Sequence, residues 1–449
     1  MSDLGDIARA VVERAANGEQ VEAFVARSHS TSVRVYEGQV EALTSGASYG
    51  IGVRVIIDGR EGFASAGSLE PDVVAETFEE ARANAAFAEP DEWAGLAEPD
   101  GVAQPDLDLD DGSAIRRIGE QSKINTALDL EARVRAADPR ITSVRTTTWG
   151  DGWGEVAISS TMGIDVESTG GSCSVSTSPL ASDGDETQIG YAVDAARRPD
   201  DLDIDRFGDE AADRATAMLG ATKPPSERVT VVLERPVVAA FLGIVSGMLG
   251  GDRVVKGRSP FAERLGEVIA IPALTLVDDP TDDRSLGADR HDGEGLATRR
   301  NPLIVDGVLQ GFLHNSYTGR RSRAASTGSG VRGYGSTPAV GAQALQILPG
   351  PDHLDQAAVL ALIGNGFLVQ TVSGLHSGVN PVSGDFSVGV AGHRIRDGAR
   401  AEPHREATIG STLQRMLLDV VAIGGDLEWL AGGTGTVTLA IGDVSLSGS

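Results

Sequence analysis

Histidine and cysteine are the residues of this chain that most directly bind metals or act as nucleophiles. The sequence has seven histidines and one cysteine. No two histidines lie three to five residues apart, so no helix face presents a pair of zinc ligands. A zinc site assembled from distant histidines stays open on these spacings. The histidines are His29, His291, His314, His353, His376, His393 and His404.

The single cysteine, Cys173, excludes an intramolecular disulfide and any metal site built from several cysteines. It lies in the strand-like stretch GGSCSVS, which has no neighbouring His or Lys to favour a thiolate. We therefore expect a buried structural thiol rather than a nucleophile.

Polar residues and glycines are concentrated in residues 374–392, which hold five glycines, an Asn-Pro pair and several hydroxyls. Glycines at this density allow close approach of another strand or of a bound peptide. A tight turn between core strands and a binding site are both compatible with this pattern. Ser377, His376 and Asp385 are also the residue types of a nucleophile, a base and an orienting carboxylate. Adjacent residues on a strand point to opposite faces, which argues against a self-sufficient hydrolase.

Three short matches to known motifs fail on their context. Residues 328–333 fit G-x-G-x-x-G, but no strand-to-helix transition surrounds them. Residues 46–50 fit G-x-S-x-G within a predicted hairpin rather than a nucleophile elbow. His404 and Glu406 resemble half of a deaminase motif whose other half needs two cysteines. We assign no chemistry to these matches.

Composition and charge limit the function classes. The chain has 449 residues with 38 basic and 65 acidic side chains, a net charge of −27, and 57 glycines. This charge repels phosphate backbones and anionic lipids, which argues against nucleic acid and membrane-surface roles. The start lacks the pattern of a signal peptide, and the apolar run 236–251 is too short to span a bilayer. We expect a cytoplasmic protein.

The elements that position these residues follow from hydrophobic periodicity and turn signals. The first half alternates helices with short strands, and Lys223-Pro224-Pro225 is the best domain boundary. The second half is glycine-rich and mostly strand-like. Predicted helices cover residues 4–16, 71–88, 113–137 with Ser113 as N-cap, 209–219, 236–249, 352–363 and 408–424. Predicted strands include three or four short ones within 31–67, which turns at Glu37-Gly38, Gly46 and Asp58-Gly59 separate. Further strands are predicted within 141–193, at Val229–Glu234, and in a hairpin around Asp306-Gly307.

Three segments carry a resemblance to a known family. Residues 378–392 read GVNPVSGDFSVGVAG, residues 293–299 read GEGLATR followed by IVDGVL at 304–309, and residues 50–65 contain GIGVRV and DGREGFAS. These stretches resemble the TldD/PmbA family of peptidases, in particular its PmbA (TldE) branch. The resemblance covers nearly the whole chain. It implies an α+β fold, with an N-terminal mixed domain (1–222) and a β-rich, barrel-like C-terminal domain (223–449).

The resemblance also locates a metal motif that this chain lacks. Metal-bearing TldD members have H-E-x-x-x-H on the helix after the strand that opens the second domain. This chain has Gly243 and Ile244 for the His-Glu pair and Met248 for the second His. None of these side chains supplies a zinc ligand or a general base. The C-terminal sequence also lacks the cysteine found near the end of metal-bearing members.

The resemblance therefore implies a metal-free subunit of a heterodimeric metallopeptidase that acts on unfolded peptides. Zinc is expected only in a TldD-like partner, with no cofactor on this chain. A stand-alone homodimeric peptide-binding module is the alternative. The residues expected to contact substrate or partner, rather than to catalyse, are His376, Ser377, Gly378, Asn380, Asp385, Phe386 and Ser387.

Overall fold

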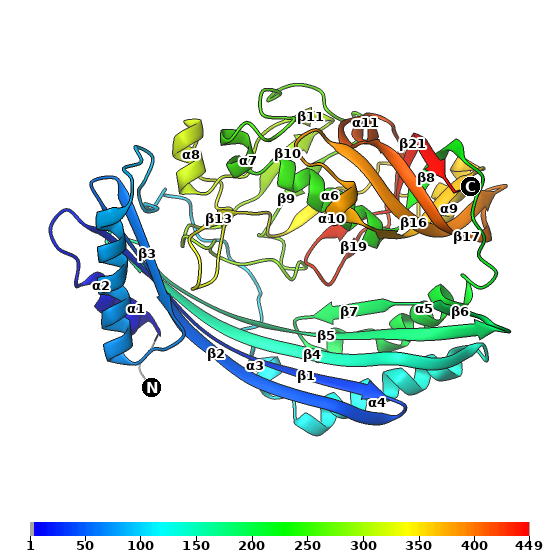
Figure 1. The fold of residues 1–449 in the computed structure, drawn as a ribbon, viewed down its shortest axis with the longest axis horizontal. Coiled ribbons are helices and arrows are strands. Elements are labelled where there is room, and N and C mark those ends of the chain that lie inside the picture. Colours follow the sequence, from blue (N-terminus) through cyan, green and yellow to red (C-terminus); the bar gives the residue numbers. More distant parts are fainter. Residues whose placement is uncertain (1–3, 449) are drawn as a thin grey trace.

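The computed structural model describes residues 4–448. Its first part is a long antiparallel sheet in the order β3-β2-β1-β4-β5-β6, in which β7 also pairs with β5. The sheet curves along its length, and the C-terminal part of the chain faces its concave side (Figure 1). Its strands are β1 (Gln20–Tyr36), β2 (Gln39–Ile57), β3 (Arg60–Ala66), β4 (Ile141–Ser160), β5 (Asp165–Asp183), β6 (Glu186–Ile189) and β7 (Ala192–Ala196).

The prediction of several short strands in this part was wrong. β1, β2, β4 and β5 are 17 to 20 residues long. The turns at Glu37-Gly38 and Asp58-Gly59 are confirmed, because all four residues have positive φ. Gly46, which was expected to break a strand, pairs with Ser30 in an uninterrupted register. Glycine ends a strand where the backbone needs positive φ, and here it stays extended.

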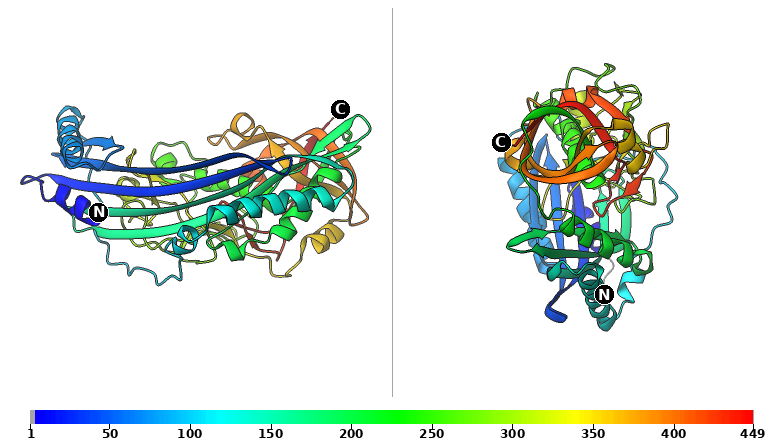
Figure 2. Two further views of the ribbon diagram at one scale, coloured as in Figure 1. Left: turned by 90° about the horizontal axis from the view of Figure 1, so that it is seen from below. Right: turned by 90° about the vertical axis from the view of Figure 1, so that its right-hand side faces the viewer.

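Helices cover the sheet at both ends. They are α1 (Leu4–Val12), α2 (Pro71–Phe87), α3 (Ser113–Arg116), α4 (Glu120–Ala137) and α5 (Ile204–Thr216). α4 lies along the convex face, seen from below in Figure 2. The predicted helix 113–137 is broken, because Gly119 is extended between α3 and α4. Gly112, with φ 80°, occupies the N-cap position instead of Ser113.

A closed barrel forms the second part. β8 (Glu227–Leu233) is parallel to β15 (Gly366–Ser373), and the order continues through β16 (Asp385–Arg396) and β17 (Ala399–Thr412). β21 (Leu439–Ser447) pairs with both β8 and β17, which closes the ring. β18 (Val420–Ile423) extends it beside β21. The mixed α+β fold with a barrel-like C-terminal domain is therefore confirmed.

A second sheet packs beside the barrel in the order β11-β10-β9-β14-β20-β19, and β12 pairs with β13. Its strands are β9 (Leu276–Asp278), β10 (Asn301–Val305), β11 (Val308–Leu309), β12 (Gly330–Val331), β13 (Ala339–Val340), β14 (Leu345–Ile347), β19 (Glu428–Trp429) and β20 (Gly435–Thr436). The helices of this part are α6 (Arg235–Met248), α7 (Gly251–Val255), α8 (Ser316–Ser322), α9 (Gln356–Ile363), α10 (Leu375–Gly378) and α11 (Leu413–Leu418). A short 3-10 turn, Pro199–Asp201, precedes α5.

The helix predicted over 408–424 was wrong. Residues 408–412 end β17, α11 takes six residues, and β18 follows. Thr408, Ile409 and Thr412 are β-branched and favour extended backbone, while Thr412 also caps α11 by accepting a hydrogen bond from the Arg415 N–H. Tertiary strand pairing with β16 and β21 determines this segment.

Arginine side chains hold the two parts together. Arg332 forms a 2.7 Å ion pair with Glu22 of β1, and both side chains are 1% exposed. Arg320 of α8 donates hydrogen bonds to the carbonyls of Trp93, Gly95 and Leu96. The division at residue 222 stays a prediction. No helix within residues 4–448 is long and apolar enough to cross a membrane.

Candidate functional site

α6 occupies the position expected for a metal-binding helix, directly after β8. Its apolar side chains join the core shared with the barrel strands, and Met248 is fully buried among them. Ile244 is partly buried against the same core. Gly243 is exposed and has no side chain. Zinc needs imidazole, thiolate or carboxylate ligands, so these three positions do not fit a metal.

The exposed side of α6 borders a hollow of about 370 Å³. A Cβ atom added at Gly243 or Gly247 would meet nothing within 4 Å, so the two glycines leave space on the helix surface. Ser246, Asp252 and Arg253 add polar groups to its wall. The remaining wall comes from Gly250, Leu313, residues 340–343, Leu345, Gly432 and Thr434.

The histidines are dispersed, and two of the buried ones make structural contacts. His314 Nδ1 lies 3.2 Å from Thr318 Oγ1, and His393 Nε2 donates to the Ala217 carbonyl. Burial lowers the pKa of both imidazoles. Within residues 4–448, no three His, Cys, Asp or Glu side chains are grouped so as to hold a metal ion. Cys173 is 2% exposed, and burial raises the pKa of its thiol to about 12, as for a structural thiol.

The loop that precedes β16 organises itself through its own polar side chains. The Asn380 carboxamide accepts the N–H of Val382 at 2.9 Å. The Ser383 hydroxyl donates to the Asp385 carboxylate at 2.6 Å. Gln414, from α11, donates to the Ser383 carbonyl. Asn380 and Asp385 therefore shape the loop, whose outer surface is exposed.

Ser377, His376 and Asp385 do not form a catalytic triad here. The Ser377 hydroxyl donates to the carbonyl of Gly374, and Asp385 binds Ser383 instead of a histidine. His376 and Ser387 are exposed, while Phe386 is 5% exposed and belongs to the core. A Cβ at Gly378 would overlap with the Ser387 carbonyl oxygen, so this glycine is needed for packing. A contact role for these residues stays a prediction.

The segment around residues 292–299 is held by buried carboxylates. Asp292 accepts the N–H groups of Glu294, Leu296 and Gly330. Glu294 accepts both the N–H and the hydroxyl of Ser316 at the start of α8. Burial, with Glu294 nearby, raises the pKa of Asp292. The carboxylates thus hold β12 and the start of α8 in place.

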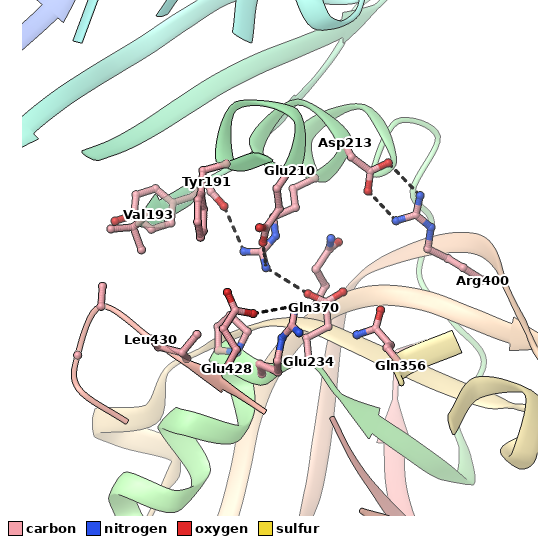
Figure 3. Close-up of a pocket in the computed structure, with 16 residues that line it drawn as sticks. Tyr191, Val193, Glu210, Asp213, Glu234, Gln356, Gln370, Arg400, Glu428 and Leu430 are labelled. Atoms are coloured by element: carbon pink, nitrogen blue, oxygen red, sulfur yellow. Dashed lines mark hydrogen bonds and ion pairs between the residues drawn. The ribbon is translucent and has the colours of Figure 1, made fainter. Parts of the chain in front are cut away.

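A second hollow, of about 430 Å³, lies between α5 and the barrel (Figure 3). Glu234 and Gln370 lie at its base on the barrel side. Arg214 of α5 also lines the pocket. Burial raises the pKa of Glu234 to about 7. This pocket was not predicted from the sequence. The charged Glu234-Arg235 pair between an apolar strand and an apolar helix was the available signal.

A curved antiparallel sheet joined to a closed barrel, with α6 after the first barrel strand, defines a two-part α+β class of protein. Solved structures share this fold over 99% of this chain. TldE from Thermococcus kodakarensis superposes with a TM-score of 0.88 at 23% identity, over 99% of its own chain. A putative modulator of a DNA gyrase from Thermotoga maritima gives a TM-score of 0.89 at 24% identity, also over 99% of its chain.

Sequence comparison identifies the family. Models of the PmbA/TldA metallopeptidase domain 1, central domain and C-terminal domain match residues 21–85, 114–219 and 226–448. The metalloprotease PmbA of Escherichia coli O157:H7 is 27% identical, over 92% of this chain and 89% of that protein. The PmbA homolog of Haemophilus influenzae is 26% identical over 89% and 85%. This chain belongs to the PmbA/TldD metallopeptidase family.

Proposed function

We propose that this chain is the metal-free, PmbA/TldE-like subunit of a heterodimeric metallopeptidase that cleaves unfolded peptides. The observation that carries the proposal is the state of α6. Gly243 and Ile244 have no metal-binding atoms, and Met248 is fully buried in the core. Hydrolysis by a metal-bound water needs a ligand set and a general base, and this helix supplies neither. Zinc chemistry then comes from a TldD-like partner.

The open surface of α6 supports a role in enclosing substrate. Gly243 and Gly247 leave open space on the helix surface, next to the hollow of about 370 Å³. A peptide backbone needs such room to approach another backbone closely. The exposed loop with His376, Ser377, Asn380 and Ser387 offers further contacts to a peptide or to the partner. This chain would form a wall of the proteolytic chamber and align the peptide.

Co-expression with an H-E-x-x-x-H-bearing homologue from the same genome tests the proposal. We expect a stable one-to-one complex that contains stoichiometric zinc and hydrolyses unfolded peptide. This chain purified alone is expected to contain no stoichiometric zinc and to cleave nothing. Zinc-dependent cleavage by the chain purified alone would contradict the proposal. A stable homodimer that binds peptide and ignores the homologue would favour the stand-alone binding module instead.

A metal-independent hydrolase is disfavoured by the geometry of the loop, because Ser377 and Asp385 each bind another partner. Ser377→Ala tests it in the same preparation. We expect the substitution to leave hydrolysis by the complex within about twofold of the parent complex.

A further inference from the structure

The pocket between α5 and the barrel lies where two parallel strands end side by side. β8 and β15 pair up to Leu233 and Val369, and the next residues are Glu234 and Gln370. Gln370 is a β-bulge, because the register of β15 with β16 skips it between Val369 and Thr371. Bulges redirect side chains and are over-represented beside active sites. Two polar residues far apart in the chain therefore meet at one edge.

The pocket contains charges that are unequally compensated. Arg400 pairs with Asp213 at 2.8 Å, and Arg235 pairs with Glu428 at 2.9 Å. Arg214 lies 2.6 Å from Glu210 but 3.4 Å from Glu234. Arg206, outside the lining, shares Glu428. Four carboxylates line the pocket: Glu210, Asp213, Glu234 and Glu428. Within residues 4–448, Glu234 has one ion pair, to Arg214 at 3.4 Å, and this is longer than the shortest ion pair of each of the other three. Its negative charge is therefore the least neutralised of the four.

Gln370 provides an independent sign of a ligand. The residue is 5% exposed, and its carboxamide has no hydrogen-bond partner within residues 4–448. Figure 3 shows the carboxamide directed from β15 into the pocket toward α5. The carboxamide offers two donor hydrogens and one acceptor oxygen at the pocket surface, so a ligand that both accepts and donates hydrogen bonds would pair with it. Apolar walls from Tyr191, Phe207 and Leu430 flank these groups.

We propose that this pocket binds the free amino end of a peptide. The terminal ammonium pairs with the Glu234 carboxylate, the first peptide group bonds to the Gln370 amide, and the first side chain contacts the apolar wall. The arginines are already engaged at shorter distances with other carboxylates, which favours an ammonium over a carboxylate ligand. The volume, about 430 Å³, suits one or two residues. The inference rests on the proposed function only in that the ligand is a peptide.

Binding is expected to depend on pH. Glu210 and Arg214 of α5, Arg235 of α6 and Arg400 of β17 surround Glu234, and burial raises the pKa of its carboxyl to about 7. The carboxylate form is needed for the ammonium, so affinity should rise from pH 6 to pH 7.5. Above about pH 8 the peptide amine loses its proton and affinity should fall again.

Isothermal titration calorimetry on this chain tests the inference with the tripeptide amide leucyl-alanyl-alaninamide. N-acetylation of the probe should weaken binding about tenfold or more, because it removes a buried charged contact. An acetylated tripeptide with a free C-terminal carboxylate tests whether the pocket binds an anion instead of an ammonium. An acetylated dipeptide amide that contains lysine separates a side-chain ammonium from the peptide terminus. Tighter binding of the carboxylate probe, or equal binding of free and acetylated amines, overturns the proposal.

Glu234→Gln should remove the preference for the free amine, and Glu402→Gln serves as the matched control. Glu402 lies on the same barrel but pairs with Arg396 on its surface. Circular dichroism verifies folding, and the probe comparison on the unsubstituted chain decides the question if a variant does not fold. Amine binding without a zinc-bearing complex would contradict the proposed function alone. A working complex whose single subunit ignores the amine would contradict this inference alone.

Discussion

Glu234 and Gly378 illustrate two different constraints on single residues. At Glu234 the constraint is a buried charge, and at Gly378 it is the lack of room for a side chain. Glu234 is a carboxylate kept 8% exposed beside a 3.4 Å ion pair. Gly378 stands where the loop before β16 touches the strand itself. The resemblance identified Gly378 directly. Glu234 was visible only as the end of a predicted strand, because its environment comes from α5 and β15.

The burial of Glu234 should make the free energy of unfolding depend on pH. Its folded-state pKa of about 7 lies above the ordinary 4.5, so the folded protein binds this proton more tightly. The resulting stability is fully present below pH 4.5 and is lost as pH rises through 7. Glu234→Gln removes this loss. Relative to the parent, the variant should gain on the order of 2 kcal/mol between pH 5 and pH 8, measured by urea unfolding.

Glu402→Gln again provides the comparison. The Arg396 guanidinium holds the pKa of the Glu402 carboxyl at about 2, so its contribution is lost only in acid. Its difference from the parent should stay flat between pH 5 and pH 8. An equally flat difference for Glu234→Gln would show that the carboxyl is not perturbed as described.

Gly378→Ala should destabilise the loop and the barrel edge. The added Cβ overlaps with the carbonyl oxygen of Ser387, and that backbone is fixed by pairing between β16 and β17. Overpacking of this kind costs about 1–3 kcal/mol. Ser377→Ala, at the exposed neighbouring position, should change stability by less than about 0.5 kcal/mol. Thermal unfolding of both variants measures the contrast, and equal midpoints would contradict the close approach.

The two sides of α6 have different environments, because Met248 is buried in the core and Gly243 is exposed beside the hollow. Met248→Ala should cost about 2–5 kcal/mol, because it leaves a cavity in the core. Gly243→Ala should stabilise by about 0.5–1 kcal/mol, because its Cβ enters open space on an exposed helix. Chemical denaturation checks both. If Met248→Ala increased the free energy of unfolding, Met248 would not be packed in the core as described.

Elements were predictable from the sequence where local signals were strong. Helix α2 and the turns at Gly38 and Gly59 follow from proline, periodicity and positive-φ residues. The long strands were missed because glycine and serine inside β2 and β5 resemble turns. The 408–424 segment was missed because its apolar residues also fit helical spacing, while pairing with β16 and β21 decided it. The glycines of 378–392 could be identified from the resemblance. The pocket at Glu234 could not, since it needs the parallel pairing of β8 with β15.

At the scale of the whole molecule, the buried Arg332–Glu22 pair connects the barrel half to the curved sheet. Arg332 also donates to the Gly293 carbonyl at 2.6 Å and lies over the Phe24 ring. Within the described part of the chain, Arg332→Ala leaves Glu22 with one ion pair, to Arg54 at 3.3 Å. We expect a loss of about 3–5 kcal/mol, as for a broken buried pair, in urea unfolding.

Arg396→Ala is the matched control for that loss. It breaks an exposed pair with Glu402, and because water and salt screen such pairs, the free energy of unfolding should be nearly unchanged. Similar losses for the two variants would show that the interface between the halves contributes little to stability.

Zinc content and peptide hydrolysis, measured together on each chain and on their complex, test the central claim most directly. With a TldD-like homologue, the account predicts one zinc per heterodimer and hydrolysis that disappears when the partner's metal-binding histidine is replaced. This chain alone should hold no stoichiometric zinc and show no cleavage. Stoichiometric zinc and zinc-dependent hydrolysis in this chain without a partner would contradict the account.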